Sequence, residues 1–163
     1  MHVQPFFLVA AHRSGTTLLR LLLGHHPKIA RCDEMEFVVP GLNKSIESYK
    51  RWLKTERNYL ASGYEVDWSK PFLEIAHGFL QQRQKLDGCE IVGATVHNQF
   101  HRLVEIWPDA LFIGLHRDPR DVALSSVQMG WHGTAWSGAN EWIKAQYCFE
   151  ELKRRVSSKR LFE

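Results

Sequence analysis

The stretch from Phe6 to Leu19, FFLVAAHRSGTTLL, changes character halfway along. Its apolar first part, up to Ala11, is suited to a buried strand, and the leucine-rich continuation from Thr16 is typical of a helix. The polar corner between them, Arg13–Thr17, therefore stands at a helix N-terminus. Free backbone N–H groups and the helix dipole favour an anion at such a place. The corner is similar to a phosphate-binding loop.

This loop departs from the common triphosphate-binding pattern, G-x-x-x-x-G-K-[ST]. The first glycine of that pattern is absent, Gly15 stands where the pattern has lysine, and the cation precedes the glycine as Arg13. Any function has to explain this rearrangement. The groups that we expect to contact an anion here are the backbone N–H groups of Gly15, Thr16 and Thr17, the hydroxyls of Ser14, Thr16 and Thr17, and the guanidinium of Arg13.

Size and composition limit the possible classes of protein. A chain of 163 residues, 44% hydrophobic and 24% charged, predicts a single folded domain over residues 1–163. The net charge of +3 suits a small anionic ligand but not a nucleic-acid partner. The three cysteines form no CxxC pair, which argues against a zinc ribbon. The sequence contains no membrane-spanning run and no signal peptide, so we expect a cytoplasmic protein.

Apolar runs alternate with helical patterns along the chain. Strands are predicted at residues 5–11, 90–96 and 111–116, and helices at 16–23, 42–61, 70–85, 99–107, from Pro119 onward and at 139–156. The alternation favours an α/β fold with a three-layer, mainly parallel sheet flanked by helices, similar to the P-loop NTPases. The acidic segment 33–36 is expected to be exposed. Residues 159–163 are typical of the opening of another strand, so we expect a domain truncated before its C-terminal part.

A second strand–helix junction carries another arginine. Arg117 follows the third predicted strand, and Ser125 lies eight residues later, about two turns into the next helix. Asp118 is a good N-cap, Pro119 suits the first helical position, and Asp121 is placed for a capping box. A guanidinium and a hydroxyl so spaced can hold one phosphate. Because the carboxyl ends of parallel strands meet at one edge of a sheet, we expect the two junctions to converge on one ligand.

Together the two junctions resemble the sulfotransferases that use 3′-phosphoadenosine-5′-phosphosulfate (PAPS). Arg13–Thr17 is similar to their 5′-phosphosulfate loop, with arginine as in protein-tyrosine sulfotransferases and many bacterial members, and Arg117 with Ser125 is similar to their 3′-phosphate motif. The resemblance implies transfer of a sulfuryl group to a hydroxyl or amine of a small molecule, a glycan or a protein side chain. It also implies adenosine 3′,5′-bisphosphate (PAP) as product, no metal, and Arg13 as the group that stabilises the departing phosphate.

The resemblance offers two candidates for the base that deprotonates the acceptor. In protein-tyrosine sulfotransferases a His-Pro segment after the loop leads to a catalytic glutamate, and His26, Pro27 and Glu34 match that arrangement. The rival is His97, which ends the second predicted strand, where small-molecule sulfotransferases place a catalytic histidine. The lysine of their Lys-Thr-His motif is missing here. The resemblance therefore favours Glu34 over His97.

Other interpretations stay open. A P-loop nucleotide or small-molecule kinase would need Mg²⁺ ligands and a Gly-Lys-Ser/Thr loop, and this loop has no such lysine. A non-catalytic nucleotide-binding fragment is the second alternative, because the family's later basic, glycine-containing loop has no equivalent in this chain. His97 and His101 have i,i+4 spacing without an HExxH motif, so no metal site is predicted. The segment Trp131–Trp136 is either a mobile flap over the acceptor or ordinary packing.

Overall fold

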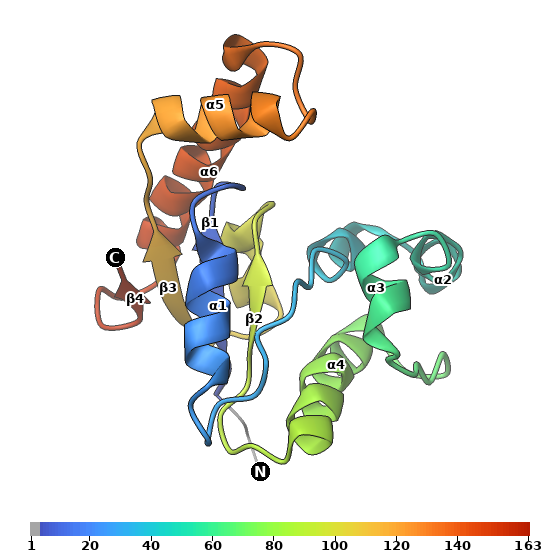
Figure 1. Cartoon of the computed structure of the whole chain (residues 1–163). Coiled ribbons are helices and arrows are strands. Elements are labelled where there is room, and N and C mark those ends of the chain that lie inside the picture. Colours follow the sequence, from blue (N-terminus) through green and yellow to red (C-terminus); the bar gives the residue numbers. More distant parts are fainter. Residues whose placement is uncertain (1–3) are drawn as a thin grey trace.

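The structure is a computed structural model that describes residues 4–163. Within this range four parallel strands form one sheet in the order β2-β1-β3-β4. Figure 1 shows α1 in front of the sheet and α6 behind it, which gives three layers. The predicted α/β fold with a parallel sheet is confirmed. The strands are β1 (Phe6–Ala10), β2 (Gly93–Val96), β3 (Leu111–Leu115) and β4 (Leu161–Phe162). The helices that cover the sheet are α1 (Thr16–Gly24) and α6 (Ala135–Arg155), and α5 (Pro119–Gln128) packs on α6 beyond the end of the strands.

The central strand β1 is buried on both faces, which explains its unbroken apolar sequence. Phe7 and Val9 join the large core that includes side chains of α6. Phe6 and Leu8 point to the other face, where Leu19 of α1 packs against them. Since the sheet ends at Ala10 on this strand, the residues that follow it lie at the carboxyl edge, where ligands of such sheets bind.

The prediction of one helix over residues 42–61 is wrong. The segment contains a 3₁₀ helix, η1 (Val39–Asn43), followed by α2 (Ile46–Leu53) and α3 (Arg57–Ser62). Side chains placed inside the predicted helix act as N-caps: Ser45 accepts from the Ser48 N–H and Glu56 accepts from the Tyr59 N–H. A capping side chain marks the start of a new helix, so the spacing of apolar residues alone did not predict the breaks in this region.

Two other predicted helices differ from the structure. The helix predicted over 99–107 is the 3₁₀ helix η2 (Phe100–Glu105), entered through Gln99 at φ 50°. The last helix begins at Ala135 instead of 139, because Thr134 and Ser137 form a capping box. The helix predicted over 70–85 is confirmed as α4 (Phe72–Asp87). Asp118 caps α5 as expected, but Asp121 forms an ion pair with Arg117 at 3.6 Å and the capping box is not made.

The expectation that residues 33–36 are exposed is wrong. The Thr95 N–H donates to the Asp33 carbonyl and the Met35 N–H donates to the Thr95 carbonyl, both at 3.0 Å. The segment thus runs parallel to β2 along its outer edge, with bridges at Ile29 and Glu34. Met35 is buried in the core as a result. Residues 28–35, the edge segment, place Glu34 beside the carboxyl end of the sheet.

Close packing of α5 on α6 depends on a glycine. A Cβ at Gly138 would lie 2.8 Å from the carbonyl oxygen of Ala123 and 3.0 Å from its Cα. We expect Gly138→Ala to lower the free energy of unfolding by about 1–3 kcal/mol, measured by urea denaturation. The matched control is Gly78→Ala in α4, where a Cβ meets nothing within 4 Å and helix propensity favours alanine by about 0.5–1 kcal/mol. Equal stability of the two variants would contradict this packing.

Candidate functional site

The two arginine-bearing junctions meet at the carboxyl edge of the sheet. Nε of Arg13 donates a hydrogen bond to Oγ of Ser125 on α5 at 2.9 Å. Nη1 of Arg117 donates to the backbone carbonyl of Arg13 at 2.8 Å. The expected convergence of Arg13, Arg117 and Ser125 is confirmed as geometry. Their roles toward a ligand stay predictions.

The loop before α1 leaves its polar groups open to a ligand. Gly15 is the N-cap of α1 at φ 95° and supplies no side-chain cap, so the N–H groups of the first turn have no partner within the helix. Ser14 is 8% exposed, and its Oγ is buried without a hydrogen-bond partner among the described residues. Thr16 is buried and Thr17 is exposed in the same turn. An unpaired buried hydroxyl beside a free helix N-terminus fits an anionic group.

Arg13 itself has a left-handed backbone, at φ 67°, which is uncommon for a residue with a side chain. Its guanidinium carbon lies 5.5 Å from the ring centroid of Trp131, in the connection between α5 and α6. The same indole contacts the ring of His12 edge to face, with 5.8 Å between centroids. Trp131 therefore contacts the loop while remaining 51% exposed, and Trp136 is 80% exposed on α6. Whether this segment moves as a flap stays a prediction.

His97 lies directly after β2, as predicted, and is buried. Its Nδ1 donates to the Ala10 carbonyl at 3.0 Å, because a carbonyl can only accept, and Nε2 is then the nitrogen without a proton in the neutral ring. The ring lies against that of His12, with 4.1 Å between centroids and the two planes tilted by 33°. Burial lowers the pKa of His97 below its usual 6.5, so the imidazole is neutral at pH 7 and able to accept a proton.

Glu36 is a part of the site that sequence reasoning missed. One carboxylate oxygen accepts the N–H of His97, and the other accepts from Asn98 twice, from its N–H at 3.2 Å and from Nδ2 at 2.9 Å. Asn98 Nδ2 also lies 3.4 Å from Nε2 of His12. Burial raises the pKa of Glu36, although these hydrogen bonds oppose the shift. Glu36 thus holds the turn that carries His97. Its only signal in the sequence was its place two residues after Glu34.

Glu36→Gln is expected to lower the free energy of unfolding by about 1–3 kcal/mol. The amide has one acceptor oxygen where both oxygens of the carboxylate accept N–H groups, so one backbone N–H of the turn loses its partner. Denaturation with urea measures the change, and Glu47→Gln on the outside of α2 is the control. Equal stability of Glu36→Gln and the wild type would show that the turn does not depend on this carboxylate.

The structure places the two candidate bases in different cavities. Glu34 lines a cavity of about 680 Å³ together with residues of α1, α3 and α4. His97 lines one of about 490 Å³ with His12, Asn98 and residues of α6. The Glu34 carboxylate makes no hydrogen bond or ion pair within the described part of the chain, and its charge opposes the lowering of the His97 pKa. The geometry therefore leaves both residues as candidates.

Two further observations concern metal-binding groups and membrane-spanning helices. Within residues 4–163, no group of three or more histidine, cysteine, aspartate and glutamate side chains is arranged to hold a metal ion. His97 and His101, at helical spacing in the sequence, are separated by the turn into η2. No helix in the same range has the length and apolar character needed to cross a membrane.

Known proteins resemble this chain over nearly its full length. The sulfotransferase domain of the olefin synthase from Synechococcus PCC 7002 superimposes with a TM-score of 0.63 at 17% identity, covering 99% of this chain and 66% of that one. The sulfotransferase domain from the curacin biosynthetic pathway gives 0.61 at 15% identity, covering 98% and 66%. Sulfotransferase STF9 from Mycobacterium avium gives 0.51 at 16% identity, covering 98% and 58%. These likenesses show the fold, which is P-loop NTPase-like.

Sequence comparison gives the family. An uncharacterized protein of Aquifex aeolicus (strain VF5) is 29% identical over 138 residues, which are 80% of this chain and 18% of that protein. The chain thus spans less than a fifth of this curated relative and about two thirds or less of the solved structures. The family model described as "Sulfotransferase family" matches residues 5–163. With the Arg13–Thr17 corner and the Arg117–Ser125 junction inside that match, the chain belongs to the sulfotransferase family.

Proposed function

We propose that this chain carries the donor site and the catalytic groups of a sulfotransferase that uses PAPS. The observation that carries the proposal is the contact of Arg13 with Ser125 and Arg117 beside the open N-terminus of α1. Two guanidiniums and a row of free N–H groups lie together, which suits a ligand with anionic groups at two positions. PAPS and its product PAP are such ligands.

Each end of the donor has matching residues. Arg117 and Ser125 would hold the 3′-phosphate, as in the family motif that they resemble. The 5′-phosphosulfate would be held by the N–H groups of Gly15, Thr16 and Thr17 and the hydroxyls of Ser14, Thr16 and Thr17. The unpaired, buried Oγ of Ser14 supports this assignment, because a buried hydroxyl normally has a partner. The absence of lysine from the loop suits a donor that carries no triphosphate.

The donor supplies the sulfuryl group and a phosphate as leaving group. Arg13 stabilises the negative charge that develops on this phosphate, and it does so by charge and hydrogen bonding, because a guanidinium does not give up its proton. Glu34 takes the proton from the attacking hydroxyl or amine, with His97 as the alternative base. The acceptor, a small molecule, a glycan or a protein side chain, attacks in line with the departing phosphate.

Calorimetry with PAP and with ATP plus Mg²⁺ tests the proposal. We expect PAP to bind with a dissociation constant on the order of micromolar, with the same affinity in the presence of EDTA. ATP with Mg²⁺ is expected to bind more weakly, because this loop lacks the lysine of the triphosphate pattern. Tighter, metal-dependent binding of ATP would instead favour a kinase. Binding of PAP without transfer to any acceptor would favour a nucleotide-binding module.

A further inference from the structure

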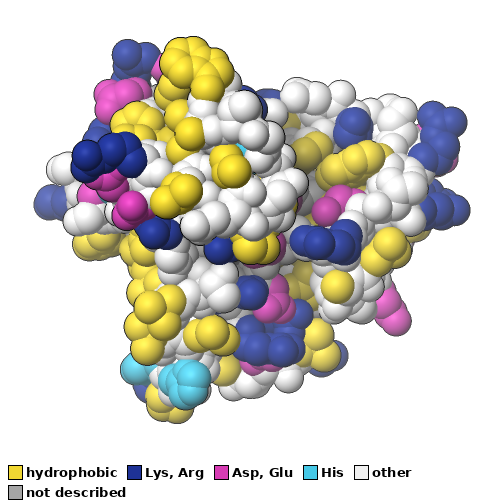
Figure 2. Space-filling view, turned by 45° about the horizontal axis from the view of Figure 1, so that its top comes forward, with side chains coloured by type: hydrophobic (Ala, Val, Ile, Leu, Met, Phe, Trp, Pro, Cys, Tyr) yellow, Lys and Arg dark blue, Asp and Glu magenta, His cyan; other side chains and the backbone are white. Residues whose placement is uncertain are grey.

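The cavity that contains Glu34 is rich in arginine. Four segments contribute one arginine each: Arg20 from α1, Arg31 from the edge segment, Arg57 from α3 and Arg83 from α4. Three acids face them, namely Asp33, Glu34 and Asp87. Figure 2 shows basic and acidic side chains gathered in the hollow between α1 and the α2–α3 region. The lining therefore carries one more positive than negative charge.

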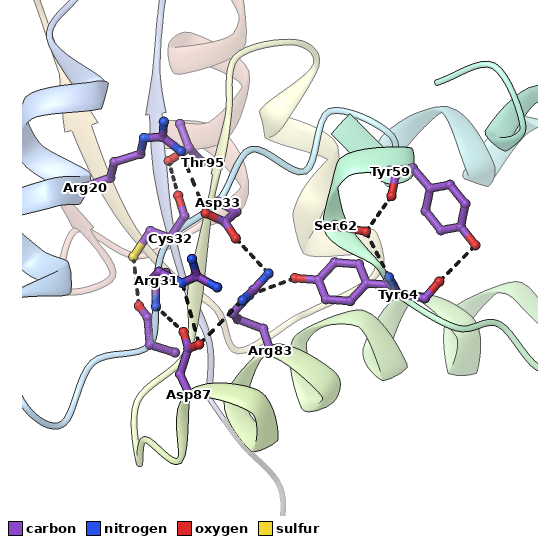
Figure 3. A network of polar contacts seen from close by, with 11 residues as sticks. Arg20, Arg31, Cys32, Asp33, Tyr59, Ser62, Tyr64, Arg83, Asp87 and Thr95 are labelled. Carbon is purple, nitrogen blue, oxygen red and sulfur yellow. Dashed lines mark hydrogen bonds and ion pairs between the residues drawn. The ribbon is translucent and has the colours of Figure 1, made fainter. Parts of the chain in front are cut away.

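Two of the three acids form ion pairs with arginines of the cavity wall. Arg83 is 4% exposed and forms ion pairs with Asp33 at 2.8 Å and with Asp87 at 3.5 Å, while its Nε donates to the Tyr64 hydroxyl at 3.2 Å. Asp87 also pairs with Arg31 at 3.6 Å. Figure 3 shows this network joining α4 to the edge segment. Arg83 and Arg31 are thus satisfied by Asp33 and Asp87, and their role is to hold the cavity wall.

The other two arginines lack adequate partners. Nη1 of Arg20 reaches Asp33 only at 3.9 Å, and Nε of Arg20 is buried without a hydrogen-bond partner in the described residues. Arg57 is exposed, lines the cavity and makes no hydrogen bond or ion pair within residues 4–163. The buried and unpaired Nε of Arg20 is unfavourable, and an anionic group on a ligand removes that penalty, while the exposed guanidinium of Arg57 is free to bind the same group.

Resting on the proposed function, we infer that this cavity is the acceptor subsite and that the acceptor carries an anionic group beside its nucleophile. Arg20 and Arg57 bind a carboxylate, sulfate or phosphate of the acceptor, and Glu34 in the same cavity faces the hydroxyl or amine. A planar guanidinium matches such anions with two parallel hydrogen bonds. Arg20 also sits on α1, the helix that begins at the phosphosulfate loop, so the acceptor anion and the donor are held by one rigid element.

A matched pair of phenols tests the subsite. The protein is saturated with PAP, which fills the donor site, and titrated with 4-hydroxyphenylacetate and with its neutral amide, 4-hydroxyphenylacetamide, followed by NMR or calorimetry. We expect the carboxylate to bind roughly tenfold more tightly than the amide. Arg57→Gln and Arg20→Gln should each reduce this preference several-fold, and Arg57→Lys should keep part of it. Arg51→Gln, an exposed arginine of α2 outside the cavity, should leave the preference unchanged.

The outcomes separate this inference from the proposed function. Equal binding of acid and amide, or a preference that survives both Arg57→Gln and Arg20→Gln, would overturn the subsite while PAP binding still supports the donor site. If PAP itself does not bind, the proposed function fails. The same titration without PAP then tests whether the cavity binds anions. Loss of the preference for the carboxylate in Arg57→Gln supports an anion site in the cavity, and persistence of that preference contradicts one.

Discussion

Replacing Arg117 with alanine is expected to weaken the binding of PAP by roughly 10- to 100-fold. Two losses combine in this variant. The 3′-phosphate loses a charge-assisted contact of about 1.5–3 kcal/mol, and the Arg13 carbonyl loses the 2.8 Å hydrogen bond that ties the loop to β3. Arg117 is partly exposed, so solvent screening places the effect toward the lower part of the range for two such contacts.

Calorimetric titration with PAP measures the change. Arg120→Ala is the matched control, because Arg120 is an exposed arginine three residues later, in the first turn of α5, that pairs with Asp118 instead of the loop. We expect its affinity for PAP to stay within about twofold of the wild type. An Arg117→Ala protein that binds PAP as tightly as Arg120→Ala would contradict the assignment of the 3′-phosphate site.

Replacing Glu34 with glutamine is expected to lower kcat for sulfuryl transfer by about 10²–10⁴-fold, the usual contribution of a general base. The amide keeps the size of the side chain but cannot take the proton. Since Glu34 lines a cavity apart from the Arg13–Ser125 contact, the affinity for PAP should be nearly unchanged. Single-turnover assays with radiolabelled PAPS and PAP titrations provide the two measurements. Glu65→Gln, an exposed acid outside this cavity, is the control.

The rival base predicts a different pattern. If His97→Ala abolishes transfer while Glu34→Gln does not, the assignment of Glu34 is wrong. The dependence of kcat on pH tests the protonation state of His97 in the case where it is the base. Burial lowers the pKa of His97, so a reaction with His97 as base keeps its rate as the pH falls through 6.5. The rate is then lost at lower pH, when the imidazole becomes protonated.

The donor side of the site was predictable because its residues follow one another closely along the chain. Arg13 to Thr17 lie in a single strand–helix corner, and Arg117 and Ser125 lie in another. Each corner is bounded by an unbroken apolar run, and parallel strands end at a common edge. Only the direct hydrogen bond between Arg13 and Ser125, across 112 positions of sequence, required the structure.

The acceptor side was not predictable in the same way. Glu36 looks like a solvated acid in the sequence, but pairing of the edge segment with β2 brings it under the N–H groups of His97 and Asn98. The helices around the Glu34 cavity were also misjudged, since Ser45 and Glu56 cap new helices where the apolar period continues. Charged side chains such as Arg20 and Arg57 carry no periodic signal that assigns them to one cavity.

By itself, therefore, the sequence determined the α/β fold, the two arginine-bearing corners and the resemblance to sulfotransferases. These features depend on local order along the chain, where apolar runs, caps and loops are encoded within a few residues of one another. Only the tertiary structure decided that Glu36 supports His97, that Glu34 and His97 line separate cavities, and that four arginines from four segments share one of them. These contacts depend on how α1, α3, α4 and the edge segment pack together, and no single stretch of sequence encodes that packing.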